Sequence, residues 1–261
     1  CQVSADRDLE LRVCTGIDDD IWNINGNHFA ETEIQEKDGV DGIVCRTIQD
    51  GRSVAVAAKI CITAGASVTD KKQDVTVIHA SLKKDVPFVM EKYTAICKET
   101  DCQDVWESAV CCCMESAERG FEFLKEEQRR LWGERYRRLG IEIKGDEEAQ
   151  QAVLYSAYLL YSSAPAHTDR VAIPARGLSG QVYKGAMFWD TEIYMLPMFA
   201  FCDPAIARNL VMYRVRNLEG AREKAAEYGY RGAFYPWESQ ENGKDGCTLY
   251  NLTDIFTGRK I

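Results

Sequence analysis

The hydrophobic pattern of this 261-residue chain changes its period once, close to Asp101. Before that point apolar and polar residues alternate, as Val54, Val56 and Ala58 do, which is typical of strands with one face in a core. The alternating segments are residues 9–15, 42–48, 54–62, 75–81 and 86–96, separated by turn-forming residues. Beyond Asp101 the period becomes helical. The sequence therefore predicts an α+β protein, with an antiparallel β-sandwich first and helices after it.

The first helical segment directly follows the predicted sandwich. Residues 103–132 predict one or two helices rich in Glu, Lys and Arg. The residues expected to be buried there are Trp106, Val110, Phe121, Leu124 and Leu131.

The later helices are separated by long loops. Asp146 is the predicted N-cap of a helix that ends before Pro165, with Tyr155, Tyr158 and Tyr161 in its core face. Residues 191–201 predict another helix. The pair Asp203 and Pro204 predicts the start of a third, which is expected to run to about residue 228. Long loops between helices are unusual unless they build a site, so this order predicts the opening of an α/α toroid.

Charge and cysteine usage narrow the classes of partner. The chain has 41 acidic and 32 basic residues, a formal charge of -9, so it should repel nucleic acid. It has no apolar run near the roughly 20 residues that a membrane span needs. The eleven cysteines include the run at 111–113 but no CxxC pair. We therefore expect free, buried thiols in a cytoplasmic protein, with no metal site.

Two short segments combine aromatic rings with a carboxylate. One is Phe188-Trp189-Asp190, and the other runs from Phe234 to Ser239 and contains Trp237 and Glu238. A pyranose offers an apolar face for stacking and hydroxyls that donate to a carboxylate, so two such loops suggest one carbohydrate site.

Structural roles would also explain these residues. Asp190 can be a helix N-cap with Trp189 packed against the core, Trp237 can be a packed ring beside a solvated Glu238, and Arg176 can be a structural arginine. The residues alone leave both interpretations open.

A longer motif favours the carbohydrate interpretation. The run ARGLSGQVYKGAMFWDTEIYMLPMF at residues 175–199 resembles the signature of family 65 glycoside hydrolases. Further matches occur at residues 203–239 and 247–260, and the resemblance covers about residues 85–261. It implies three parts: residues 1–100 as part of an N-terminal β-sandwich, 101–140 as a helical linker, and 141–261 as the first portion of an (α/α)6 catalytic barrel. The chain starts without Met and stops in mid-pattern, so we expect it to be incomplete at both ends.

The resemblance also implies an activity. Members of the family are mostly inverting phosphorylases of α-glucosides such as maltose, trehalose, kojibiose or nigerose, and commonly homodimers. They use inorganic phosphate as co-substrate, need no cofactor and release β-glucose 1-phosphate. The general acid is a glutamate expected beyond Ile261, so this chain should contain no catalytic residue and be inactive alone. The alternatives are a hydrolase of the same family, such as a trehalase, and a non-catalytic carbohydrate-binding protein.

Specific residues follow from the matched motif. The resemblance implies that Trp189 and Asp190 contact the glucosyl unit. The supporting substrate-binding residues are Arg176, Tyr183, Phe188, Trp237 and Glu238. Three positions depart from the commoner pattern: Ala186 replaces a histidine, and Ser179 and Gln181 replace Thr and Glu. This variation is associated with other linkages, so the linkage and the acceptor sugar stay open.

Overall fold

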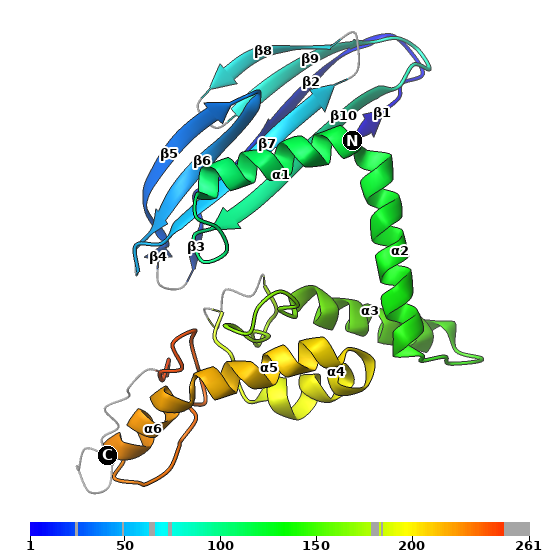
Figure 1. Cartoon of the computed structure of the whole chain (residues 1–261). Coiled ribbons are helices and arrows are strands. Elements are labelled where there is room, and N and C mark those ends of the chain that lie inside the picture. Colours follow the sequence, from blue (N-terminus) through cyan, green and yellow to red (C-terminus); the bar gives the residue numbers. More distant parts are fainter. Residues whose placement is uncertain are drawn as a thin grey trace, which may run out of the picture. The chain divides into compact units, whose positions relative to one another are not determined.

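The computed structural model describes residues 1–23, 26–48, 50–62, 66–72, 75–178, 183 and 185–247. The chain divides into two compact units, Cys1–Leu131 and Trp132–Ile261. Antiparallel strands come first and helices follow, which confirms the predicted fold class (Figure 1).

Two sheets form most of the first unit. The strands are β1 (Gln2–Val3), β2 (Leu9–Gly16), β3 (Trp22–Asn23), β4 (Gly26–Asn27), β5 (Phe29–Lys37), β6 (Val40–Thr47), β7 (Ser53–Ile62), β8 (Ala66–Lys72), β9 (Val75–Leu82) and β10 (Phe88–Lys98). One sheet has the order β1-β10-β7-β6-β5 and the other β2-β9-β8, with antiparallel neighbours throughout, and β3 pairs with β4. The alternation predicted β2, β6, β7, β9 and β10, but not β5 or β8. Edge strand β5 is mostly exposed, so it lacks the alternation that marks a half-buried strand.

The two larger sheets pack face to face. Ile78 and Leu82 of β9 lie in one buried cluster with Phe88 of β10, and Ile60 and Ile62 of β7 pack against it. The predicted sandwich is therefore built from the inward faces of strands far apart in the sequence.

Helix α1 (Val105–Arg119) covers the opposite face of the five-stranded sheet (Figure 1). Ala55 and Ala57 of β7 are buried beneath it together with Trp106, so β7 is covered on both faces. The ring of Trp106 lies directly over Gly42 of β6, where any side chain would overlap it.

Helix α2 (Phe121–Leu139) follows α1 after Gly120. The expectation of buried contacts holds for Trp106 and Val110 but is wrong for Phe121 and Leu131, which are exposed. Within the described part of the first unit these two side chains stay exposed, although their spacing on the helix is that of buried residues.

The second unit is helical. Its helices after α2 are α3 (Glu147–Ser163), the π-helical turn η1 (Thr191–Met195), α4 (Leu196–Cys202), α5 (Pro204–Arg216) and α6 (Leu218–Glu227). Asp146 caps α3 as predicted, by accepting a hydrogen bond from the N–H of Ala149 at 2.9 Å. Asp203 makes no such cap bond to α5, and its carboxylate instead lies 3.4 Å from the guanidinium of Arg138. The single predicted helix from Pro204 is wrong, since it is interrupted at Asn217.

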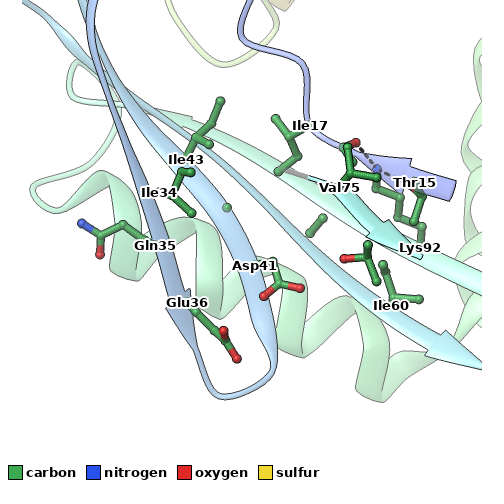
Figure 2. Close-up of a pocket in the computed structure, with 14 residues that line it drawn as sticks. Thr15, Ile17, Ile34, Gln35, Glu36, Asp41, Ile43, Ile60, Val75 and Lys92 are labelled. Carbon is green, nitrogen blue, oxygen red and sulfur yellow. Dashed lines mark hydrogen bonds between the residues drawn. The ribbon is translucent and has the colours of Figure 1, made fainter. Parts of the chain in front are cut away.

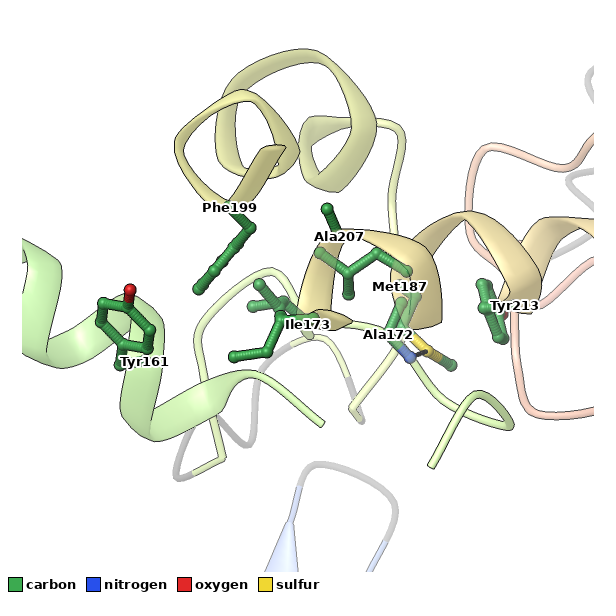
Figure 3. Close-up of a cluster of buried hydrophobic side chains, with 9 residues drawn as sticks. Tyr161, Ala172, Ile173, Met187, Phe199, Ala207 and Tyr213 are labelled. Atoms are coloured by element: carbon green, nitrogen blue, oxygen red, sulfur yellow. Dashed lines mark hydrogen bonds between the residues drawn. The ribbon is translucent and has the colours of Figure 1, made fainter. Parts of the chain in front are cut away.

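One apolar core holds the second unit together (Figure 3). Phe199 of α4 is fully buried and meets the ring of Tyr161 edge-on, with 5.3 Å between ring centres. Ile173 and Met187, from the two ends of a long loop, enter the same core. The expectation that Tyr155 and Tyr158 are core residues is wrong, because both are exposed. The core anchors the loop on both sides of its Arg176 segment.

All eleven cysteines are free, as expected. Only Cys45 and Cys113 are buried, so burial was predicted wrongly for most of them. Among the described residues, no three His, Cys, Asp or Glu side chains gather in a way that could hold a metal ion. No helix in the described part of the chain combines the length and apolar character needed to cross a bilayer.

Candidate functional site

Two loops that are about fifty residues apart in the sequence meet in the second unit. The backbones of Met187 and Ser239 exchange two hydrogen bonds of 2.9 Å, as a short antiparallel bridge. This bridge holds the segment of Phe188, Trp189 and Asp190 beside the loop that carries Trp237. The structure therefore brings the two aromatic segments together.

The aromatic rings form a continuous cluster. The ring centres of Trp189 and Trp237 are 5.3 Å apart with an interplanar angle of 79°. Phe188 lies 5.6 Å from Trp237 and 5.2 Å from Tyr183, again edge-on in both pairs. Perpendicular ring pairs are favoured because the positive edge of one ring meets the negative face of the other.

Exposure divides this cluster into two layers. Trp189 is 36% exposed, Tyr183 42% and Trp237 48%, whereas Phe188 is only 5% exposed. Phe188 is therefore the buried ring beneath Tyr183 and Trp237 and presents almost no surface to a ligand. The three exposed rings present an apolar surface that solvent can reach.

Asp190 lies at the start of η1, next to Trp189. Its backbone is already helical, with φ −52° and ψ −34°, and its side chain makes no capping hydrogen bond to the described residues. The N-cap interpretation of Asp190 is therefore not supported. Asp190 is half-buried and directly follows Trp189, which is exposed.

Arg176 and Glu238 lie at the margins of the cluster. The guanidinium carbon of Arg176 is 5.6 Å from the centre of the Tyr183 ring. Arg176 also lines a separate pocket of about 440 Å³, formed mainly by the end of α3 and the loop after Ile173. Glu238 is half-buried, and its carbonyl accepts a 2.8 Å hydrogen bond from the N–H of Gly246.

The departures from the motif fall on different parts of the structure. Ala186 is 1% exposed, and its N–H donates to the carbonyl of Tyr183 at 2.8 Å. Ser179 and Gln181 lie outside the described residues.

Sequence reasoning missed the residues that join the two loops. Arg214 of α5 bonds the carbonyl of Phe188, the hydroxyl of Ser239 and the carboxylate of Glu192. Arg208, Arg214 and Arg216 all lie on the same short helix, and nothing in their spacing shows which one points inward. The only feature of the sequence that pointed to these contacts was Glu192, the partner of Arg214, which lies within the family motif.

Two further residues, Tyr213 and Lys224, contact the second loop. The hydroxyl of Tyr213 lies 2.5 Å from that of Ser239 and donates to the carbonyl of Gln240 at 2.7 Å. Burial raises the pKa of Tyr213, so the hydroxyl stays protonated and can donate. Lys224 of α6, which is nearly buried, pairs with Asp245 at 2.5 Å and lies 4.2 Å from the centre of the Phe234 ring.

The first unit contains a cavity of its own, of about 240 Å³, between the two sheets (Figure 2). Ile43 and Ile60 contribute apolar surface to it, and Lys92 donates to the hydroxyl of Thr15 and the carbonyl of Gly16. None of the predicted site residues lines this cavity.

Comparisons with known proteins match both units. The model described as "Glycosyl hydrolase family 65, N-terminal domain" matches residues 1–135, and "Glycosyl hydrolase family 65 central catalytic domain" matches residues 154–260.

Individual relatives agree with these matches. A nigerose phosphorylase of Lachnoclostridium phytofermentans is 37% identical over 99% of this chain and 38% of its own length. A kojibiose hydrolase of Flavobacterium johnsoniae is 43% identical over 44% of this chain and 17% of its own. The solved structure of a proposed kojibiose phosphorylase from the human microbiome superposes with a TM-score of 0.83 at 20% identity, over 96% of this chain and 34% of that one. The chain thus spans little more than a third of the length of the relative and the solved structure that match nearly all of it.

Proposed function

The chain belongs to glycoside hydrolase family 65, and on that premise we propose that it is part of a longer inverting α-glucoside phosphorylase. The longer protein would convert an α-linked glucosyl disaccharide and phosphate into β-glucose 1-phosphate and a free sugar. Residues 1–100 would be part of its N-terminal sandwich, 101–140 a helical linker, and 141–261 the start of its (α/α)6 barrel. The eleven free thiols support a cytoplasmic location.

The observation that carries this proposal is the meeting of the two aromatic loops. Trp189 and Trp237 present exposed indole rings at nearly a right angle, and Asp190, which directly follows Trp189 in the sequence, makes no capping hydrogen bond to the described residues. An indole face suits the C–H face of a pyranose, and an ionised carboxylate accepts strong hydrogen bonds from its hydroxyls. We assign to these three residues the contacts with the glucosyl unit.

The other predicted residues receive supporting roles. Phe188 packs against Trp237 and Tyr183, and Arg176 lies near the Tyr183 ring, so these residues would support the wall. Glu238, which directly follows Trp237, is assigned a supporting role as well. None of these groups is proposed to transfer a proton.

The chemistry would be completed outside residues 1–261. Inverting glycosidases need a general acid for the leaving oxygen and a general base for water. Phosphate is already an anion at neutral pH, so a phosphorylase needs the acid alone. We propose that a glutamate beyond Ile261 protonates the leaving oxygen while phosphate attacks the anomeric carbon from the opposite face. The 261-residue chain by itself should therefore bind sugar at most.

Hydrolysis is the second candidate, because the Flavobacterium johnsoniae relative named a kojibiose hydrolase matches 44% of this chain. Phosphorolysis requires phosphate as a co-substrate, whereas hydrolysis does not. We expect the longer protein to consume one of a panel of α-linked disaccharides, with kojibiose, nigerose, maltose and trehalose included, only when phosphate is present. The product measured is glucose 1-phosphate, by a coupled enzymatic assay. Release of free glucose at the same rate with and without phosphate would establish the hydrolase instead.

A further inference from the structure

The side chain of Arg214 joins the two loops of the candidate site at one point. It donates from Nε and Nη2 to the two carboxylate oxygens of Glu192, at 2.9 and 2.8 Å. Nη2 also donates to the carbonyl of Phe188, and Nη1 donates to the hydroxyl of Ser239, both at 3.0 Å. The side chain is only 12% exposed.

The three acceptors belong to the segments that carry the exposed indoles. The Phe188 carbonyl is part of the peptide bond that leads into Trp189. Ser239 is two residues after Trp237, and it is 1% exposed. Glu192 lies within η1, where the N–H of Leu196 bonds the carbonyl of Thr191. A shift of the guanidinium would therefore move the backbone beside both indoles.

The backbone of Arg214 is itself fixed to the second loop. Its carbonyl accepts a 3.0 Å hydrogen bond from the hydroxyl of Tyr235, which comes two residues before Trp237. The neighbouring Tyr213 bonds Ser239 and Gln240. The end of α5 thus contacts the Trp237 loop on both sides of the indole.

We propose that Arg214 is a positioning residue that sets the distance and angle between Trp189 and Trp237. Its consequence for sugar binding rests on the function proposed above, whereas its consequence for the ring geometry does not. A planar guanidinium can direct hydrogen bonds to three acceptors at fixed angles, which the single ammonium of a lysine cannot do. A partly buried ion pair adds little net stability compared with apolar packing, so fixing the geometry is the distinctive role of this group.

The first experiment measures ring geometry in the 261-residue chain. Two indoles in close contact give a coupled pair of bands in far-ultraviolet circular dichroism, and Trp237→Phe defines the signal of the Trp189 and Trp237 pair by difference. We expect Arg214→Met to remove that signal and Arg214→Lys to retain only part of it. Arg216→Lys is the matched control, because Arg216 lies on the same helix and pairs with Asp169 instead.

A second control separates geometry from stability. Ile206→Val trims a buried residue of α5 and should lower the melting temperature while leaving the coupled signal intact at temperatures where the chain is folded. A full coupled signal in Arg214→Met, equal to that of Arg216→Lys, would overturn the positioning role.

The kinetic experiment uses the longer protein. Because small misplacements of binding groups reduce rates strongly, Arg214→Lys should lower kcat/KM for phosphorolysis by about 10- to 100-fold, and Arg216→Lys by less than about 2-fold. An unchanged kcat/KM in Arg214→Lys contradicts the positioning role. If the parent protein forms no glucose 1-phosphate at all, the proposed function fails, while the coupled signal still decides the role of Arg214.

Discussion

At the scale of single residues, the sequence was most informative where chemistry depends on residue type. The pairing of an indole with a carboxylate marked Trp189, Asp190 and Trp237, and the structure brings the two indoles into contact. The sequence did not reveal Arg214, because a single arginine on an amphipathic helix looks the same whether it points outward or inward. The direction of a side chain depends on partners that fold in from elsewhere.

Asp190 gives a test of the proposed glucosyl contact. Because its carboxylate caps no helix, Asp190→Asn should leave the melting temperature unchanged. In the longer protein it should lower kcat/KM by about 10- to 100-fold, since a hydrogen bond to a charged acceptor contributes roughly 1.5 to 3 kcal/mol. Asp203→Asn is the matched control, because Asp203 also precedes a helix without capping it, and its carboxylate pairs with Arg138 instead. A loss of stability with unchanged kinetics would assign Asp190 a structural role.

The Asp245 and Lys224 pair predicts a pH dependence. Burial alone would raise the pKa of Asp245, but hydrogen bonds from Lys224 and Cys247 outweigh it, so the pKa lies below its ordinary value of 3.8. The unfolded chain therefore takes up the proton first as the pH falls. The stabilisation is fully present above about pH 4 and is lost as the pH drops through the folded pKa.

We expect Asp245→Asn to lower the free energy of unfolding by about 1 to 3 kcal/mol at neutral pH, because it leaves the ammonium of Lys224 nearly buried without its charge partner. The measurement is the melting temperature of both proteins as a function of pH. The difference between them should shrink below pH 3.8. Glu219→Gln, which removes an exposed ion pair with Arg222, should show little difference at any pH. A constant gap for Asp245→Asn would disprove the linkage.

At the scale of elements, periodicity predicted those strands and helices that have one buried face. It found β2, β7, β9 and β10, and the cap at Asp146 located α3. It missed β5, because an exposed edge strand needs no alternation. It also placed Tyr155 and Phe121 in a core, because helical spacing defines a face without showing whether anything packs on it.

The contact between α1 and the five-stranded sheet requires glycine at position 42, beneath Trp106. Gly42→Ala would place a methyl group against the Trp106 ring and the Val56 carbonyl, so we expect it to cost about 1 to 3 kcal/mol. Gly133→Ala is a matched control of opposite sign. Gly133 lies within α2, and a Cβ atom added there would meet the Arg137 side chain at 3.5 Å, an ordinary contact distance. Alanine at this position should therefore stabilise the helix by about 0.5 to 1 kcal/mol. Denaturant unfolding of both variants measures the two effects, and a Gly42→Ala protein as stable as wild type would contradict the described packing.

At the scale of the whole molecule, residue pattern and motif together were enough for fold class and family. The predicted fold class agrees with the two units, and the predicted family agrees with the two family matches. The glycosidic linkage of the substrate could not be predicted from the three positions that depart from the family motif. Ser179 and Gln181 are outside the described residues, and Ala186 is buried. A buried residue such as Ala186 affects a binding site only through the residues packed around it, and a single sequence does not show which residues those are.

The central claim is that the two aromatic loops form the glucosyl-binding wall of an inverting phosphorylase. Proton nuclear magnetic resonance of the reaction between the longer protein, its disaccharide and phosphate tests this most directly, because the anomeric signal of the first product identifies the reaction. We predict β-glucose 1-phosphate as the first product, formed much more slowly by the Asp190→Asn variant. Two molecules of free glucose per disaccharide with no glucose 1-phosphate, the α-phosphate as the first product, or an undiminished rate in Asp190→Asn would contradict it.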